Sequence, residues 1–320
     1  MPLVEVRQLS VHYRIRSQAL GAGERIIRAV DNVSFDGNSG ESLGLVGESG
    51  CGKTSLGRAI MRLTEPTSGS VWLDGEDITR LKGGALRSRR RKFQMIFQDP
   101  QTTLDPRMPV EEIVGEALDI LELVPNRRER RARVVSLIES VGLAVDHLCR
   151  YPHEFSGGQR QRIAIARALA VQPRFIVCDE PVSSLDVSVQ GQIINLLRDL
   201  QHAHGIAYLF ISHDLAVVEH ISHRIMVMYL GKLVEIGDTK AICTAPKHPY
   251  TQALISAVPE ISPESRWRRI MLSGEPPSPI SPPSGCPFHP RCPMAEERCR
   301  STPPELRQVG EDHRVACHLG

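Results

Sequence analysis

A glycine-rich segment at residues 47–54 has the composition and spacing of a phosphate-binding loop. It reads Gly-Glu-Ser-Gly-Cys-Gly-Lys-Thr and fits the pattern G-x-x-x-x-G-K-[ST]. Glycines let the backbone turn tightly and point its N–H groups at an anion. In such loops a lysine, here Lys53, reaches the β- and γ-phosphates, and a hydroxyl, here that of Thr54, ligates Mg²⁺. The segment predicts a nucleotide site but does not indicate which reaction the nucleotide drives.

The residues on either side of this loop have the pattern that the motif requires. Residues 43–46 are a short apolar run, as expected for a buried strand of a parallel sheet. After the loop, residues 55–63 are expected to form a helix with Leu56, Ile60 and Leu63 on one face. A helix that opens at Gly52 would add its positive end to the anion site.

Three further polar positions follow predicted strands. Asp179 and Glu180 end an apolar run that begins at residue 174, and His213 follows the run 206–211. In open α/β sheets, ligands bind beyond the carboxyl ends of the strands, so these side chains could converge on one nucleotide. A carboxylate after an apolar run is a common Mg²⁺ holder in phosphate-loop proteins, which fits Asp179. Glu180 is then available to polarise a water molecule for attack on the γ-phosphate.

The remaining elements are expected from periodicity and from turn residues. We expect an edge strand at 3–13, with Val4, Val6 and Leu9 inward, and a helical insertion at 99–155. A strand region at 26–35, a hairpin at 69–78, a strand at 93–97, helices at 156–170 and 188–202, and a hairpin at 224–236 complete the expectation. From residue 241 onward prolines cluster and the periodicity fades, which favours a less regular C-terminal module.

Length and composition place the chain among ordinary globular proteins of about two domains. It has 320 residues, 24% of them charged and 41% hydrophobic, and a net charge of +2. The basic stretches 87–92 and 127–131 are interpreted as solvated faces, so no nucleic-acid partner is expected. No run approaches the ~20 apolar residues of a membrane span, and the first residues have no secretion signal. A cytosolic protein that reaches any membrane through a partner is expected.

Together, these motifs resemble those of the ATP-binding cassette (ABC) ATPases. Besides the phosphate loop and the two carboxylates, the segment Ser156-Gly157-Gly158-Gln159 resembles the family's signature motif. Gln98 resembles the Q-loop glutamine, Ser184-Leu185-Asp186 the D-loop, His213 the switch histidine, and Tyr13 the aromatic residue that stacks on adenine. The motifs appear in the family's order across residues 13–213.

The resemblance implies a role for each matching residue. Glu180 would be the general base, His213 would contact the γ-phosphate, and Thr54, Gln98 and Asp179 would surround Mg²⁺. Ser156 and Gly158 would bind the nucleotide of a second subunit, so that two chains paired head to tail complete each other's sites. The other residues expected at the nucleotide are Tyr13, Gly47, Glu48, Ser49, Gly50, Cys51, Gly52, Lys53, Ser55, Gly157, Gln159 and Asp186.

Longer stretches resemble the ATPase subunits of oligopeptide and dipeptide permeases. They are residues 150–162, 178–188, 248–254 and 285–293, with Val315-Ala-Cys-His318. The implied fold is an α/β phosphate-loop cassette at 1–240, with a mixed sheet core, an antiparallel β subdomain and a helical subdomain at about 99–158. A small irregular Cys-rich domain would follow at 241–320.

The same resemblance implies an importer ATPase on the cytoplasmic face of the inner membrane. Its partners would be a second, paralogous ATPase that forms a heterodimer with this chain, two membrane permease subunits and an extracytoplasmic solute-binding protein. An importer ATPase for another solute such as nickel, or an ABC ATPase outside transport, is the alternative. One departure from the family pattern is Gly37, which stands where an apolar strand residue is usual and is expected to weaken the end of its strand.

Four cysteines near the end of the chain form a second constellation. Cys286, Cys292, Cys299 and Cys317 could hold Zn²⁺ or an iron–sulfur cluster, or could remain free thiols. Structural zinc sites usually contain close Cys-x2–4-Cys pairs, and this spacing is wider. The spacing and the resemblance to permease ATPases together favour a [4Fe–4S] cluster that cross-links a small module.

Overall fold

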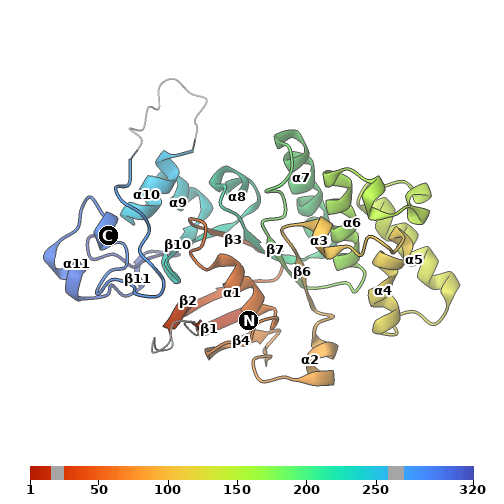
Figure 1. Cartoon of the computed structure of the whole chain (residues 1–320), viewed down its shortest axis with the longest axis horizontal. Helices are drawn as coiled ribbons and strands as arrows, with labels where there is room; N and C mark the ends of the chain where they lie inside the picture. Colours follow the sequence, from red (N-terminus) through yellow and green to blue (C-terminus); the bar gives the residue numbers. More distant parts are fainter. Residues whose placement is uncertain (16–24, 259–269) are drawn as a thin grey trace, which may run out of the picture. The chain divides into compact units, whose positions relative to one another are not determined.

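The computed structural model describes residues 1–15, 25–258 and 270–320, and it divides into two compact units. The first, here called the helical unit, comprises residue 1 and residues 38–41 and 80–210. The second, here called the β-rich unit, comprises residues 2–37, 42–79 and 211–320. Figure 1 shows the elements of both units along the chain.

The β-rich unit contains an antiparallel sheet, two of whose strands precede the phosphate loop in sequence and two of which follow it. Its order is β2-β1-β4-β5. The sequence-based prediction of an edge strand at 3–13 is therefore wrong, because β1 lies between β2 and β4. Its alternation is loose because register shifts interrupt both pairings, including one between Val6 and Leu9. The bounds are β1 (Val4–Ile15), β2 (Arg25–Gly37), β4 (Ser68–Leu73) and β5 (Glu76–Asp77).

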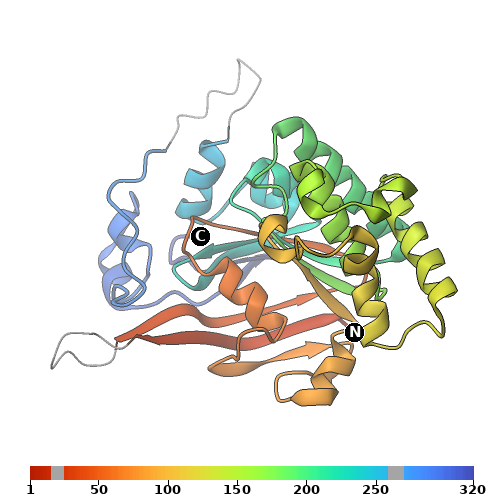
Figure 2. The ribbon, with the colours of Figure 1, turned by 45° about the vertical axis from the view of Figure 1, so that its right-hand side comes forward.

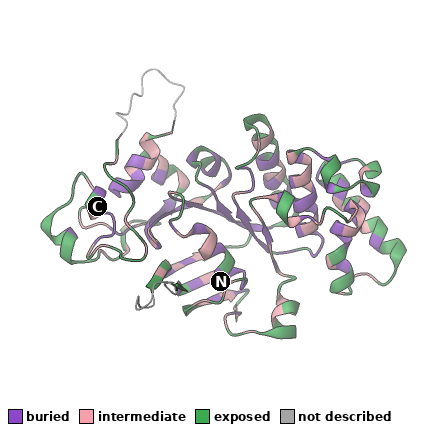
Figure 3. Ribbon diagram, in the orientation of Figure 1, coloured by how far each residue is buried: buried purple, intermediate pink, exposed green. Residues whose placement is uncertain are grey.

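The second group of strands in the β-rich unit has the order β11-β12-β10-β9-β3. Strand β3 (Ser42–Val46) pairs in parallel with β9 (Arg224–Tyr229), and β9 pairs antiparallel with β10 (Lys232–Asp238), so the sheet is mixed as expected. All five residues of β3 are buried, which explains its unbroken apolar character. In Figure 3 the strands β3, β9 and β10 are largely buried, whereas β11 is mostly exposed. The remaining elements are α1 (Lys53–Ile60), α8 (Leu215–Ile221), α9 (Thr239–Thr244), α10 (Pro249–Ser256), η3 (His289–Arg291), α11 (Glu297–Ser301), β11 (Arg307–Gly310) and β12 (His313–Val315).

The helical unit holds the insertion predicted from the sequence. It contains strands β6 (Phe93–Ile96), β7 (Phe175–Asp179) and β8 (Ala207–Ile211), of which β6 and β7 are parallel. Helix α2 precedes β6 and the other helices follow it, and the outward faces of the helices are exposed in Figure 3. Their bounds are α2 (Gly83–Arg89), α3 (Pro100–Thr103), α4 (Val110–Ile120), α5 (Arg127–Ser140), η1 (Val145–Cys149), η2 (Pro152–Glu154), α6 (Gly157–Leu169) and α7 (Val187–His204).

Local sequence signals explain several helix boundaries. Asn126 caps α5, because its side chain accepts a hydrogen bond from the Glu129 N–H. Gly205 ends α7 in the left-handed conformation with φ of 65°. The prediction for α1 is wrong at its end, because the helix ends at Ile60 and Leu63 lies beyond it, 47% exposed. Leu56 and Ile60 lie within the helix, and both are buried.

Gly37 is the last residue of strand β2, whose end we expect it to weaken. That effect on the strand stays a prediction. Strand β2 continues through Gly37, which pairs with Val4, and the Leu3 N–H donates to the Gly37 carbonyl at 2.8 Å. A Cβ at this position would lie 2.8 Å from Leu43 Cδ1 and 3.0 Å from Val4 Cγ1. The glycine therefore makes room for the two neighbouring side chains.

The structure does not support a separate Cys-rich C-terminal domain. Residues 241–320 cluster with the β-rich unit, and β12 pairs antiparallel with β10. A buried carboxylate reinforces this pairing: Glu235 on β10 lies 2.7 Å from His313 Nε2 on β12. Its two oxygens also accept hydrogen bonds from the Lys247 and His248 N–H groups. A buried carboxylate with this many partners joins three parts of the unit.

Candidate functional site

The phosphate loop lies between β3 and α1, as predicted. Figure 2 shows α1 against the strands of the antiparallel sheet, and α1 contacts both β1 and β2. Gly52 is the N-cap of α1 and has φ of 109°, a left-handed conformation that glycine adopts without strain. A Cβ at Gly52 would lie 2.0 Å from the Ala29 carbonyl oxygen, so the close approach of β2 also requires glycine. The loop therefore has the backbone form of an anion site at a helix N-terminus.

Lys53, the residue expected to bind the phosphates, is buried within the phosphate loop. Its ammonium group donates hydrogen bonds to the carbonyl oxygens of Gly47 at 2.7 Å and of Glu48 at 3.1 Å. Cys51 is also buried, and burial raises the pKa of its thiol, with Lys53 opposing the shift. Cys51 is therefore a packing residue at neutral pH, and Lys53 supplies the positive charge of the loop.

Tyr13 lies in the same unit as the phosphate loop. Its hydroxyl donates to Ser55 Oγ at 3.4 Å, and 38% of the residue is exposed. This contact connects β1 to the first turn of α1. An exposed aromatic ring next to a phosphate loop is a suitable stacking surface for a base.

His213 lines a hollow of about 450 Å³ together with Gly47. The walls come from the loop start, from residues 213–216 and from Leu254, Ala257 and Val258 at the end of α10. The Asp214 side chain caps α8 by accepting from the Ala216 and Val217 N–H groups, which fixes the turn that carries His213. Gly47 and His213, two of the predicted nucleotide residues, are 166 positions apart in the sequence and line the same hollow.

The helical unit brings a second set of predicted residues together. Gln98 Nε2 donates a hydrogen bond of 3.0 Å to Glu180 Oε2. Asp179, the last residue of β7, is 2% exposed. Glu180 has φ of 47°, an uncommon conformation for a residue with a side chain, and backbone strain of this kind is frequent at functional sites.

The signature segment forms the N-terminus of α6. Ser156 and Gln159 make a reciprocal capping box: Ser156 Oγ accepts from the Gln159 N–H at 3.4 Å, and Gln159 Oε1 accepts from the Ser156 N–H at 3.0 Å. Ser156 is exposed, so this helix N-terminus faces solvent. Behind it, a Cβ on Gly158 would lie 2.5 Å from Val189 Cγ1 on α7, and one on Gly157 3.2 Å from Leu185 Cδ2. Asp186 is the N-cap of α7.

Sequence reasoning missed two contacts of the phosphate loop. Arg291 makes two hydrogen bonds to the Glu48 carboxylate, and the Tyr250 hydroxyl accepts one from the Glu48 N–H. These partners lie 243 and 202 positions from Glu48 in the sequence. Local sequence patterns do not indicate pairing over such separations. Arg291 and Tyr250 lie in stretches that resemble permease ATPases, but the resemblance assigns them no contact with the loop.

The four C-terminal cysteines gather in one part of the β-rich unit. Cys286 and Cys299 are buried, and the Cys286 N–H donates to the Cys299 carbonyl oxygen at 2.8 Å. Burial, opposed in part by the Phe288 N–H, raises the pKa of Cys286 to about 11, with smaller upward contributions from Cys299, Cys292 and Cys317. All eight cysteines of the chain are free thiols. Within the described ranges, no three His, Cys, Asp or Glu side chains lie close enough to hold a single metal ion.

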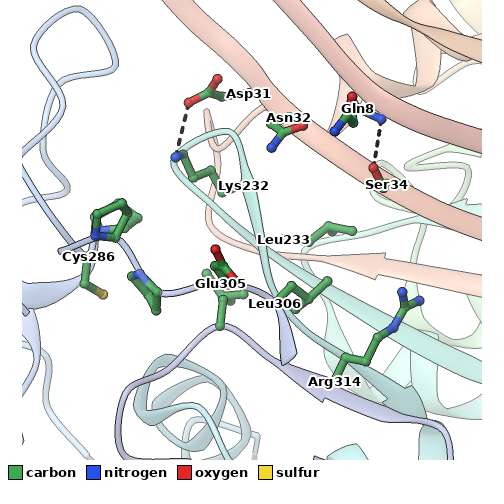
Figure 4. Close-up of a pocket in the computed structure, with 15 residues that line it drawn as sticks. Gln8, Asp31, Asn32, Ser34, Lys232, Leu233, Cys286, Glu305, Leu306 and Arg314 are labelled. Atoms are coloured by element: carbon green, nitrogen blue, oxygen red, sulfur yellow. Dashed lines mark hydrogen bonds and ion pairs between the residues drawn. The ribbon is translucent and has the colours of Figure 1, made fainter. Parts of the chain in front are cut away.

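A second hollow, of about 490 Å³, lies between β2, β10 and the C-terminal segments (Figure 4). Lys232 and Asp31 form an ion pair of 3.3 Å on its wall. Cys286 also lines it, whereas the phosphate loop does not. This hollow is therefore separate from the nucleotide residues and offers a route from solvent toward Cys286.

No helix in the part of the chain that the structure describes is long and apolar enough to cross a membrane.

Comparison with known proteins agrees with the fold and with the motifs. Residues 30–183 match the family model described as ABC transporter, and residues 234–299 match the C-terminal region of oligopeptide/dipeptide transporters. The dimeric post-hydrolysis structure of the ATP-binding cassette MJ0796, bound to ADP and Pi, has a TM-score of 0.66 and 30% identity, and the match covers 74% of this chain and 98% of that one. The fold and the motifs thus define an ABC ATPase.

Two relatives match almost the whole chain. One, from Brucella ovis, is named as a peptide import ATP-binding protein and is 52% identical over 99% of this chain and 97% of its own length. The other, the dipeptide transport ATP-binding protein DppF of Haemophilus influenzae, is 48% identical over 99% of this chain and 96% of its own. The chain belongs to the family of ATP-binding, ATP-hydrolysing subunits of oligopeptide/dipeptide ABC transporters.

Proposed function

We propose that this chain hydrolyses ATP to drive the import of oligopeptides or dipeptides through an ABC transporter. The observation that carries the proposal is the near full-length similarity to ATP-binding proteins named for peptide and dipeptide import. The match to the C-terminal region of such transporters extends it beyond the cassette itself. These names favour peptide transport over the nickel importer and the non-transport ATPase that the sequence left as alternatives.

Each site residue has a role that follows from its chemistry. The 47–54 backbone and Lys53 hold the phosphates of ATP, and Tyr13 stacks on the adenine. Thr54, Gln98 and Asp179 would hold Mg²⁺, as the family resemblance implies, and the ion would neutralise charge on the phosphates. Glu180 accepts a proton from the attacking water, and the Gln98 amide, which donates to that carboxylate, orients it. His213 lies beside Gly47, which supports its contact with the γ-phosphate.

The active form is a pair of ATPase subunits. Ser156 is exposed at a helix N-terminus, which suits binding of an anion that another chain presents. Each subunit, this chain and a paralogous ATPase, completes the other's site, and ATP stabilises the closed pair. Hydrolysis then shifts the population toward the open pair.

The partners and the location follow from the family. Two membrane permease subunits and an extracytoplasmic solute-binding protein complete the importer, and this chain attaches to the cytoplasmic face of the membrane. Residues 1–240 form the nucleotide-binding part, and residues 241–320 form the C-terminal part.

The four C-terminal cysteines hold an iron–sulfur cluster in this proposal. Four thiolates suit a [4Fe–4S] cluster or Zn²⁺. Ligands of a cluster bind different iron atoms and lie farther apart than the ligands of one ion. The support for this proposal is the proximity of the four thiols, since Cys299, Cys292 and Cys317 each contribute to the raised pKa of Cys286. When bound, the cluster cross-links the segments around Cys286, Cys292, Cys299 and Cys317.

Pairing in response to ATP tests the proposed function. Glu180→Gln should bind MgATP and persist as a closed pair with the partner ATPase, which light scattering after size-exclusion chromatography detects. Lys53→Ala, the matched control, should not pair because its loop lacks the phosphate-binding charge. An E180Q protein that remains unpaired at saturating MgATP would contradict the proposal.

A further inference from the structure

Glu48, inside the phosphate loop, is held by the C-terminal part of the chain. Arg291 Nη1 lies 2.8 Å from Glu48 Oε2, and Arg291 Nη2 lies 3.1 Å from Glu48 Oε1. This two-point geometry fixes the direction as well as the distance of the contact. The Tyr250 hydroxyl accepts the Glu48 N–H at 2.9 Å, so the backbone of the same loop residue is also fixed.

Arg291 is itself held in a fixed place. Its side chain is only 7% exposed, and Nη1 lies 3.4 Å from the Tyr229 hydroxyl. Hydrogen bonding to Glu48, partly opposed by burial, raises the pKa of Arg291, so the group remains a cation. A buried cation that lost its carboxylate would be costly, which makes this pairing persistent.

Aromatic rings pack together next to Arg291 and Tyr250, the two residues that contact the phosphate loop. Phe288, three positions before Arg291, packs edge-on against Tyr229 with ring centroids 5.2 Å apart. The Tyr250 ring lies 4.7 Å from Tyr229 and 5.4 Å from Phe288. Tyr250 is fully buried and Phe288 is 1% exposed, so the cluster is a rigid base.

The charge on Glu48 gives Arg291 a second role. A free carboxylate in the loop would repel the phosphates of ATP, and at short range that repulsion costs a substantial part of the binding energy. Arg291 neutralises this charge while it fixes the loop. A neutral residue at position 48 would not need the same partner.

We propose that Arg291 and Tyr250 are positioning residues of the ATP site, through which the C-terminal segment holds the phosphate loop ready for nucleotide and cancels the charge of Glu48. The inference rests on the proposed role of residues 47–54 as the ATP site. It assigns the C-terminal segment a role in nucleotide binding in addition to its role in packing against the rest of the β-rich unit. It requires no metal or cluster in that segment.

MgATP binding to the full-length chain tests this inference by isothermal titration calorimetry. Arg291→Gln should weaken binding about tenfold at low salt, and the loss should shrink in 0.5 M salt because added ions screen the exposed charge of Glu48. The double variant E48Q/R291Q should recover affinity to within about threefold of the parent, since it lacks the unpaired charge. Tyr250→Phe should weaken binding about threefold through the loop backbone alone.

Two controls separate the possible failures. Arg298→Gln removes an exposed ion pair with Glu296 in the same segment and should leave binding unchanged. Lys53→Ala should abolish binding, and if it does not, the proposed ATP site itself is wrong. If K53A abolishes binding while R291Q and Y250F bind like the parent, the positioning role is wrong. A loss in R291Q that neither salt nor E48Q relieves would also overturn it, because it would indicate structural damage only.

Discussion

The side-chain amide of Gln98 donates a hydrogen bond of 3.0 Å to the carboxylate of Glu180. The two residues are 82 positions apart and follow the parallel strands β6 and β7. An amide donor on a catalytic carboxylate orients the oxygen that must face the attacking water. The contact connects the residue that the family resemblance assigns to the Q-loop with the proposed general base.

Gln98→Leu should therefore lower kcat for ATP hydrolysis by about tenfold, and KM for ATP should rise by a smaller factor because leucine also removes the proposed Mg²⁺ contact. The physical reason is that leucine fills similar space without donating to Glu180. Steady-state hydrolysis by the assembled transporter measures both constants. Gln94→Leu is the matched control, since Gln94 lies on β6, the strand that Gln98 follows, and donates to the Arg90 carbonyl oxygen. An unchanged kcat in Q98L would show that the hydrogen bond does not orient the base.

Gly158→Ala should destabilise the protein by about 1–3 kcal/mol, because the new Cβ would lie 2.5 Å from Val189 Cγ1. Adding Val189→Ala should restore most of the loss by vacating that space. Gly191→Ala on α7 is the control, because no described atom lies within 4 Å of its added Cβ, and it should be neutral or stabilising. Thermal unfolding of the three variants measures the effect apart from activity. Equal melting temperatures for G158A and G191A would contradict this packing argument.

The sequence predicted the strand–loop–helix context, both carboxylates and the helical insertion, because each depends on short-range periodicity and on motif spacing. It placed β1 at a sheet edge and included Leu63 in the helix after the loop, and both predictions were wrong. Bulges disturb the alternation of β1, and the end of α1 depends on tertiary packing rather than on pattern. Arg291 and Tyr250 could not be predicted, because contacts with Glu48 over such separations arise only when the phosphate loop, α10 and η3 assemble.

Lowering the pH should destabilise the fold through His248, which caps α10. Burial lowers the pKa of His248 from 6.5 to about 3, so below pH 6.5 the unfolded chain binds a proton that the folded chain does not. The free energy of unfolding should fall by up to about 1.4 kcal/mol per pH unit between pH 6.5 and pH 3 from this group. Melting temperatures between pH 7 and pH 5 measure the slope.

Asparagine at position 248 keeps a cap acceptor but does not titrate in this range. His248→Asn should therefore show a shallower loss of stability on acidification than the parent. His202→Asn, at an exposed position on α7, should retain the parental slope. Identical slopes for H248N and the parent would refute the assignment of the acid sensitivity to this histidine.

Protein purified without oxygen should contain iron and acid-labile sulfide in the ratio of a [4Fe–4S] cluster. Cys299→Ser should lose both, because Cys299 is one of the four proposed ligands. Cys149→Ser should retain both, since Cys149 is an exposed thiol in the helical unit. Elemental analysis and a sulfide assay decide the outcome. Stoichiometric zinc without sulfide would rule out the cluster.

Peptide uptake by the reconstituted importer is the most direct test of the proposed function. Proteoliposomes with the permease subunits, the partner ATPase and the solute-binding protein should accumulate a labelled dipeptide or oligopeptide when MgATP is supplied to this chain. With Glu180→Gln in place, ATP should still bind, but uptake should fall by about a hundredfold or more because hydrolysis has lost its base. Parental uptake by E180Q, or ATP-driven uptake of another solute but of no peptide, would contradict the account.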